Sequence, residues 1–307
     1  MEEYRKFGTT DVFMFMAVVF WAINFSFIKI ALREFSPFAF NAIRLIFASL
    51  ALILVLLFRK EVLSFPKSQI WKMLSMGIIG NTIFQILFIH GINLTTASNT
   101  SIIMAMTPIF IALINSFLKH EKISWAAWVG IFISLFGCYL VITRGAGAIS
   151  FSLHYMRGDL MILGGNLCWA YYTVCAKPLL ESISPLKLTA ITMAIGAVFF
   201  IPFAAQDIYQ IPLTDISQKA WAALFYSAIF ALVISYVIWY ASVKKVGNTK
   251  TAIYGNITPI VTAVFAYIFI SERLTFLQIV GMLTILAGVY LARSGYRYFQ
   301  KNRVPST

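Results

Sequence analysis

The stretch DVFMFMAVVFWAINFSFIKIALREFSP at residues 11–37 has a second, altered copy, DLMILGGNLCWAYYTVCAKPLLESISP, at residues 159–185. The Asp, Trp-Ala, Lys and Ser-Pro of the first stretch recur 148 positions later, as 159 − 11 and 185 − 37 show. Both stretches are mostly apolar and about as long as a membrane-spanning helix. We therefore expect each to form one helix, and the chain to contain two related halves.

The composition is that of a chain that lies in a lipid bilayer. Hydrophobic residues make up 60% and charged residues 11% of the 307 residues, and the mean hydropathy is +0.84. A soluble chain is about one quarter charged. The three cysteines, Cys138, Cys168 and Cys175, lie in apolar stretches without a CxxC motif. We therefore predict no disulfide, no metal site and no cofactor.

Ten stretches are long and apolar enough to span a bilayer, which takes about 20 residues. The fold class predicted is thus an all-α integral membrane protein. The predicted helices cover residues 10–32, 37–58, 70–91, 96–118, 123–143, 158–178, 185–205, 220–243, 249–271 and 275–293. The first is predicted to be a retained helix rather than a signal peptide, because acidic residues precede it and no small-residue cleavage site follows.

The positive charges of the connecting segments predict the orientation. If the N-terminus is cytoplasmic, cytoplasmic segments hold sixteen Lys and Arg residues and outer segments hold five. This bias predicts a multi-pass protein of the plasma (bacterial inner) membrane with both termini in the cytoplasm. The same topology signals account for most of the net charge of +13, so we do not expect nucleic acid to be a partner.

The repeat continues through the later helices. NTSIIMAMTPIFIALINSFLKHEKI at 99–123 matches KTAIYGNITPIVTAVFAYIFISERL at 250–274, an offset of 151 (250 − 99). Because five crossings separate the copies, the two halves have opposite orientations in the membrane. We predict a first repeat at 1–144, an extracytoplasmic connection at 145–157 and a second repeat at 158–307 with a basic cytoplasmic tail. Inverted repeats of this kind enclose a central cavity near the bilayer midplane.

These motifs resemble those of a known family. They are FWAINFSFIK at 20–29, TPIFIALINSFLKHEKI at 107–123, GIFISLFGCYLV at 130–141 and TPIVTAVFAYIFISERLTFLQIVGMLTILAGVYL at 258–291. They are similar to the EamA branch of the drug/metabolite transporter superfamily. The resemblance implies a plasma-membrane carrier, often an exporter of amino acids or related metabolites. The Ala after each repeated Trp departs from the family, which often has Gly there.

Polar and aromatic side chains inside the predicted helices are candidates for the cavity lining. An unsatisfied amide is costly in lipid, so each either bonds to a neighbouring helix or lines the cavity. The predicted substrate-binding residues are Trp21, Asn24, Arg44, Asn81, Gln85, Met104, Trp169, Tyr172, Tyr254 and Asn256. Pro108 and Pro259 are predicted to break their helices and to act in gating, because proline removes a backbone hydrogen bond.

Charged residues inside the predicted helices are few. Arg44 lies seven residues into its helix, where it could brace the bundle or bind a substrate carboxylate. Asp11, Asp159, Glu121 and Glu272 are all predicted at helix ends. We therefore predict no carboxylate relay within the membrane, so facilitated diffusion or exchange is as compatible with the sequence as proton antiport.

No motif of a known enzyme class is present: HExxH, GxSxG, P-loop and GxGxxG are all missing, and the three histidines are scattered. We predict no enzyme but a secondary transporter that moves a small amphipathic metabolite by alternating access. Export of an amino acid or a relative is the leading case. A passive channel or uniporter and a non-transporting scaffold are the alternatives, and a homodimer is left open.

Overall fold

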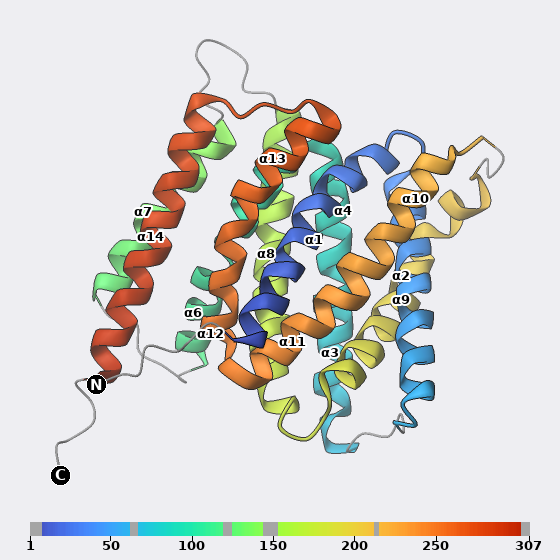
Figure 1. Ribbon diagram of the computed structural model, residues 1–307, viewed down its shortest axis with the longest axis horizontal. Coiled ribbons are helices and arrows are strands. Elements are labelled where there is room, and N and C mark those ends of the chain that lie inside the picture. The colour runs from blue at the N-terminus through green and yellow to red at the C-terminus, as the bar shows by residue number, and fades with distance from the viewer. Residues whose placement is uncertain (1–7, 62–66, 119–124, 144–152, 212–214, 302–307) are drawn as a thin grey trace.

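The computed structural model describes residues 8–61, 67–118, 125–143, 153–211 and 215–301, and these residues form helices and no strand (Figure 1). Helices lie over each of the ten predicted stretches. They are α1 Thr9–Ala31, α2 Pro37–Phe58, η1 Lys67–Gln69, α3 Ile70–Gly77, η2 Ile78–Ile83, α4 Phe84–Leu94, α5 Ala97–Met104, α6 Thr107–Phe117, α7 Trp125–Thr143, α8 Leu153–Leu179, α9 Pro185–Tyr209, α10 Gln218–Tyr226, η3 Ser227–Ile234, α11 Ser235–Val246, α12 Asn248–Ala252, η4 Ile253–Ile257, α13 Thr258–Ile270 and α14 Phe276–Lys301.

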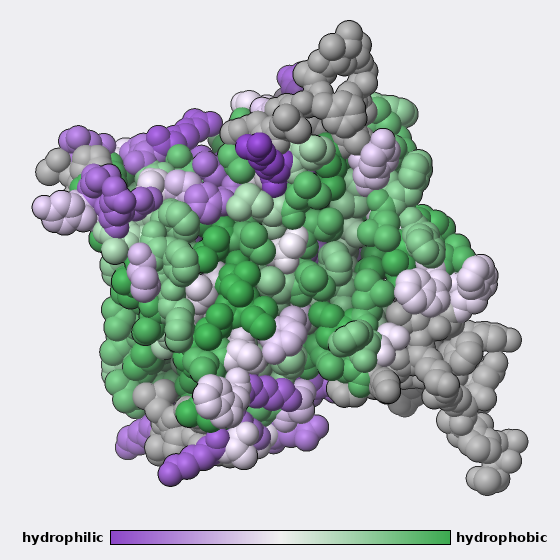
Figure 2. All heavy atoms as spheres, turned by 180° about the vertical axis from the view of Figure 1, so that it is seen from behind, coloured by the Kyte–Doolittle hydropathy of each residue, from purple (hydrophilic) through white to green (hydrophobic). Residues whose placement is uncertain are grey.

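The helices are those of a membrane protein, which confirms the predicted fold class. Eight helical segments are long and apolar enough to cross a membrane, and Phe276–Ala292 is a shorter apolar one. The helix α8 is 27 residues long but less apolar, because polar groups such as Asn166 interrupt it. Figure 2 shows a hydrophobic band with hydrophilic residues gathered above and below it. The count of ten crossings stays a prediction.

The repeated Ser-Pro dipeptide marks where the second helix of each half begins. The Ser36 side chain accepts a hydrogen bond at 3.3 Å from the backbone N–H three residues on, and Pro37 is the first residue of α2. Ser184 and Pro185 do the same for α9, at 3.1 Å. Serine is a strong N-cap and proline fits the first helical position. The Ser-Pro dipeptide therefore sets the start of α2 and, in the second half, the start of α9.

The third helix of each half contains a π-helical segment. It is η2 between α3 and α4, and η3 between α10 and α11. The two positions are related by the repeat, since 78 + 151 = 229 lies within η3. The segment η2 packs against α8 and α9, whereas η3 packs against α1 and α2. Such segments are frequent at functional sites, and both lie beside the cavity described below.

The fourth helix of each half is broken just before its Thr-Pro pair. Pro108 is the second residue of α6, and Pro259 is the second residue of α13. In the first half the carbonyls freed by this break find other donors. Asn166 Nδ2 on α8 donates to Ile103 O at 2.8 Å, and Thr107 Oγ1 donates to Met104 O at 2.6 Å. The helix α8 thus stabilises the break between α5 and α6.

The halves are interleaved rather than separate (Figure 1). The helix α1 packs along α13 from the other half, and α8 packs along α6. The helices α2 and α9 pack together, and α7 and α14 form a pair at the left edge of Figure 1. We call the end of the molecule where α1 ends and α5 and α8 begin the upper end, as it is drawn in Figure 1. The charge bias predicts that this end faces outward.

Candidate substrate cavity

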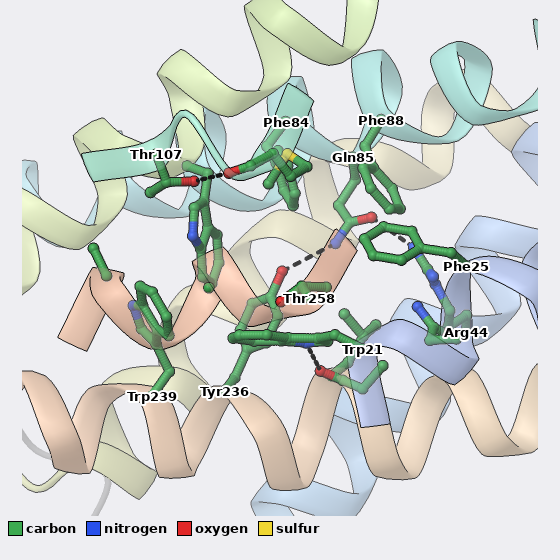
Figure 3. Close-up of a pocket in the computed structure, with 17 residues that line it drawn as sticks. Trp21, Phe25, Arg44, Phe84, Gln85, Phe88, Thr107, Tyr236, Trp239 and Thr258 are labelled. Atoms are coloured by element: carbon green, nitrogen blue, oxygen red, sulfur yellow. Dashed lines mark hydrogen bonds between the residues drawn. The ribbon is translucent and has the colours of Figure 1, made fainter. Parts of the chain in front are cut away.

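A cavity lies between the two halves (Figure 3). Its walls come from α1, α2, α4, α5, α6, α8 and the third and fourth helices of the second half. The lining residues are Trp21, Asn24, Phe25, Arg44, Phe84, Gln85, Phe88, Met104, Thr107, Trp169, Ala231, Leu232, Tyr236, Trp239, Ala252, Gly255 and Thr258. Most are apolar or aromatic, and a few polar groups converge on the space, as is typical of a small-molecule site.

Four aromatic rings form one wall of this cavity. The ring centroids of Trp21 and Trp239 are 5.4 Å apart, and those of Trp169 and Tyr236 are 4.9 Å apart. Trp21 and Trp169 meet edge to face at 6.0 Å. These separations are in the favourable range for aromatic pairs. The four rings therefore support one another in the wall.

The three indole N–H groups of this wall differ in their partners. Trp21 Nε1 donates to Ala231 O at 3.0 Å, and Trp239 Nε1 donates to Thr173 Oγ1 at 3.3 Å. Trp169 Nε1 has no hydrogen-bond partner within the described part of the chain, although Trp169 is only 4% exposed. A buried tryptophan usually finds a partner for its N–H, so this donor is available to a ligand.

Arg44 is the one charged residue in the lining, and it is 1% exposed. Its Nη1 donates to Ser227 Oγ at 2.8 Å, and its Nη2 donates to Gln85 Oε1 at 2.6 Å and to Asn41 Oδ1. Its guanidinium lies 5.3 Å from the centroid of the Phe40 ring. These contacts brace α2 against α4 and η3. They do not neutralise the charge, since none of these partners is a carboxylate.

Two polar atoms of the lining residues are buried without a hydrogen-bond partner. They are Nε of Arg44, which is a donor, and Oδ1 of Asn24, which is an acceptor. A buried polar atom without a partner costs about 1–3 kcal/mol. One of these atoms is a donor and the other an acceptor, so residues that line the cavity contain unsatisfied groups of both kinds.

The repeat is visible in the lining itself. Five pairs of repeat-related residues line the cavity together, namely Trp21 with Trp169, Gln85 with Tyr236, Phe88 with Trp239, Met104 with Gly255, and Thr107 with Thr258. Arg44 breaks this symmetry, because its equivalent is Thr192 (44 + 148), which lies outside the lining. The positive charge in the lining therefore comes from the first half and has no equivalent from the second half.

The structure brings six of the ten predicted substrate-binding residues into this lining. They are Trp21, Asn24, Arg44, Gln85, Met104 and Trp169. That they bind a substrate stays a prediction.

The other four predicted residues lie outside the lining, each for a structural reason. Asn81 is fully buried against α9, where it leaves no room for a side chain at position 196. Tyr172 is fully buried and bonds to Thr192 on α9. Tyr254 donates its hydroxyl to Asp11 at the start of α1. Asn256 is half-buried in η4, but its side chain does not reach the cavity.

The residues that the predictions missed include Tyr236 and Trp239, which carry half of the aromatic wall. The signal for them was in the sequence, because the offset of 151 maps Gln85 onto Tyr236 and Phe88 onto Trp239. Thr107 and Thr258 were likewise visible as a repeated Thr-Pro pair. Phe25 and Phe84 had no such signal, since phenylalanine is common throughout the chain.

The prediction that acidic residues lie only at helix ends was wrong for Asp159. The helix α8 begins at Leu153, so Asp159 lies within it, and its side chain is 0% exposed. The sequence favoured a later start because Arg157 and Asp159 interrupt the apolar run. Glu121 lies outside the described residues.

Fold and cavity together define the class: a multi-pass membrane protein with a largely apolar cavity between two repeated halves. Comparison with known sequences gives the family. A sequence profile of the EamA-like transporter family matches residues 8–143 and again 156–294. The chain belongs to this family.

Individual related sequences are also named as transporters. The chain is 31% identical over 283 residues to an uncharacterized transporter of Archaeoglobus fulgidus, covering 92% of this chain and 96% of the other. It is 30% identical to the uncharacterized transporter YyaM of Bacillus subtilis, covering 89% and 90%. A solved crystal structure shares the fold with a TM-score of 0.68 at 17% identity, covering 95% of this chain and 98% of that one. The chain is therefore a transporter by family.

Proposed function

We propose that this protein is a secondary transporter of the plasma membrane that carries a small amphipathic metabolite with a single carboxylate, an amino acid or a relative being the leading case. The observation that supports it most is Arg44, a buried cation at the cavity wall without a carboxylate partner among the described residues. An unpaired buried charge is costly. A substrate carboxylate would supply the missing counter-charge.

The number of charges limits the substrate. The lining holds one cationic side chain, whereas a phosphate or a polyanion calls for several convergent basic groups. It holds no Asp or Glu, so a substrate ammonium would be met by Asn24 Oδ1 and by the faces of the aromatic wall. Cation–π contacts of this kind stabilise ammonium groups in buried sites. A zwitterion with an apolar body matches all three features.

Alternating access follows from the two halves. Hydrogen bonds around the start of α5 join it to α8 and to the segment before α14 at the upper end. We infer that these bonds are formed when the cavity opens to the lower end and are broken when it opens to the upper end. With both termini in the cytoplasm, as the charge bias predicts, the first of these states would load substrate from the cytoplasm, as expected of an exporter.

A counterflow screen in liposomes tests the proposal. Purified protein is reconstituted with unlabelled amino acids, purines, sugars or sugar phosphates inside, and entry of the same labelled compounds is measured. We expect saturable entry that is accelerated by internal amino acid. Entry that is neither saturable nor accelerated would indicate a channel, and no entry of any compound would indicate a scaffold. Counterflow of a sugar phosphate alone would contradict the substrate class.

A further inference from the structure

The helix α8 carries a buried carboxylate that holds it to the junction of α4 and α5. Asp159 accepts hydrogen bonds from Thr95 Oγ1 and, at 3.2 and 3.0 Å, from Asn99 Nδ2. Thr95 ends α4, and Asn99 is in the first turn of α5. Hydrogen bonds to an ionised acceptor are about twice as strong as neutral ones. The closure of the upper end therefore depends on the charge of Asp159.

Residues from two further elements also form hydrogen bonds with the junction of α4 and α5. Lys29, near the end of α1, donates from Nζ to the carbonyls of Ile92 and Thr95 at 3.1 and 2.9 Å. Glu272, between α13 and α14, accepts from the first two N–H groups of α5 at 3.1 and 2.8 Å. These contacts all end on α5, on the last turn of α4 or on the residues between them. We call Lys29, Thr95, Asn99, Asp159 and Glu272 the upper cluster.

A second polar contact links the upper cluster to the cavity. Asn166 lies seven residues after Asp159, two turns further along the same face of α8. Its Oδ1 shares the single hydroxyl hydrogen of Thr107 with Met104 O, each acceptor lying 2.6 Å from Thr107 Oγ1, and Thr107 lines the cavity. Movement of α8 against α5 at Asp159 would therefore reach the cavity wall through the break between α5 and α6.

We propose that Asp159 is a proton-binding site, and that its protonation loosens the upper cluster and so couples proton binding to opening of the upper end. The coupling rests on the proposed transport function, whereas proton binding does not. The ionised carboxylate accepts three hydrogen bonds from Thr95 and Asn99. Protonation removes the charge and turns one oxygen into a donor, which faces two groups that already donate.

The surrounding groups favour a proton over a metal ion. A hard cation such as Ca²⁺ needs about six to eight oxygen ligands. Here the Thr95 hydroxyl and the Asn99 amide direct hydrogens toward the carboxylate, and Asn99 Oδ1 is occupied by Gln278 Nε2 at 2.5 Å. The described residues thus provide no oxygen cage around Asp159.

The charged groups around Asp159 set the direction of the pH dependence. Lys29 approaches from α1 and contacts the carbonyl of Thr95, whose hydroxyl contacts Asp159. Glu272 approaches from the segment before α14, and Cys138 of α7 is within electrostatic range. Arg157, on α8 itself, is exposed. The two donors that contact the carboxylate directly favour its charged form, so we expect the upper end to be closed at neutral pH and to open as the pH falls.

The test needs no substrate. Hydrogen exchange of the full chain in lipid nanodiscs is followed by mass spectrometry from pH 3 to pH 8, and rates are corrected for the intrinsic pH effect. We expect the α5 amides to exchange several-fold faster at the acidic end, because an exposed Asp has an ordinary pKa of about 3.9, and Asp159→Asn to abolish this dependence. Glu181→Gln is the matched control, since Glu181 is exposed at the lower end, and it should behave as the unmodified chain. A pH dependence that persists in Asp159→Asn, or opening caused by Na⁺ at constant pH, would overturn the proposal.

A second variant covers the case in which Asp159→Asn does not fold. Thr95→Val keeps the carboxylate and removes one donor to its charged form, so the charged form loses part of its stabilisation. We expect the opening midpoint to move to higher pH, and an unchanged midpoint would overturn the proposal.

Transport then tests the coupling separately. With a substrate found by counterflow, Asp159→Asn should keep counterflow but lose accumulation driven by a pH gradient. Full accumulation in this variant would refute the coupling. Failure of counterflow in the unmodified chain would instead refute the transport proposal and leave the exchange result to decide on Asp159.

Discussion

At the scale of single residues, the informative groups of the cavity are those that lack a hydrogen-bond acceptor or a counter-ion among the described residues. Three tryptophans share one wall, but the N–H groups of Trp21 and Trp239 are engaged by the protein, and that of Trp169 is not. Arg44 has hydrogen-bond partners but no counter-ion among the residues that the structure describes. A packing role alone does not require an unused donor or an uncompensated charge in the same cavity. We take these unused groups as the binding groups.

Trp169→Phe tests this interpretation. Phenylalanine keeps an aromatic face toward Tyr236, at a ring distance of 4.9 Å in the present structure, and removes only the indole and its donor. We expect normal expression, a melting temperature close to that of the unmodified chain, and an apparent substrate affinity several-fold weaker, as for the loss of one hydrogen bond worth about 1 kcal/mol. Counterflow kinetics and thermal unfolding measure the two effects.

Trp239→Phe is the matched control, because it leaves Thr173 without its indole partner. This variant should lower the melting temperature. If Trp169→Phe transports with unchanged affinity, or fails only because it does not fold, the assignment of Trp169 to the binding site is incorrect.

At the scale of elements, the first and second helices of the first half followed directly from the sequence, whereas α8 begins five residues before its predicted start and α9 ends four residues after its predicted end. The Ser-Pro caps and the apolar runs fixed the bounds of α1 and α2, which match their predicted ranges to within one residue at each end. The π-helical segments η2 and η3 could not be predicted, because their side chains are those of an ordinary apolar helix. Their existence depends on packing against two helices of the other half, which no local pattern encodes.

The same limit applies to the cavity. A polar residue in an apolar helix predicts a buried partner or a cavity, but periodicity does not say which. Asn24 and Asn81 illustrate this, since both are apolar-helix amides, yet one lines the cavity and the other packs against α9. Arg44 braces three helical elements, as one of the two interpretations of the sequence had it, and it also lines the cavity; that it binds a substrate carboxylate stays a prediction.

Gly80→Ala tests how closely η2 must approach α8. A Cβ at position 80 would lie 2.5 Å from the Tyr172 ring, whose hydroxyl bonds to Thr192 and fixes it in place. We expect a destabilisation of about 1–3 kcal/mol, as for overpacking of a filled core, measured as a lower melting temperature. Gly164→Ala is the control, because its Cβ would lie 3.5 Å from Leu87, an ordinary contact. Equal melting temperatures for both variants would contradict this packing.

At the scale of the whole molecule, the account depends on which end faces outward. The charge bias predicts that the 145–157 connection is outside and that the C-terminal tail is inside. Ala148 and Ser306, which represent these two segments, both lie outside the described residues. A single cysteine at position 148 should react with an impermeant thiol reagent on intact cells, and one at position 306 only after permeabilisation. The opposite pattern would invert the topology, and with it the predicted direction of transport.

The central claim, that Arg44 pairs with a substrate carboxylate in the cavity, is tested most directly by changing both partners. Binding of an amino acid found by counterflow is compared with binding of its decarboxylated amine, in the unmodified chain, in Arg44→Lys and in Arg44→Gln, with melting temperatures as the folding control. A charge-assisted hydrogen bond is worth about 1.5–3 kcal/mol. The unmodified chain should therefore bind the amino acid at least about tenfold more tightly than the amine, Arg44→Lys should keep part of this preference, and Arg44→Gln should lose it. An equal preference for the amino acid in the unmodified chain and in folded Arg44→Gln would contradict the account.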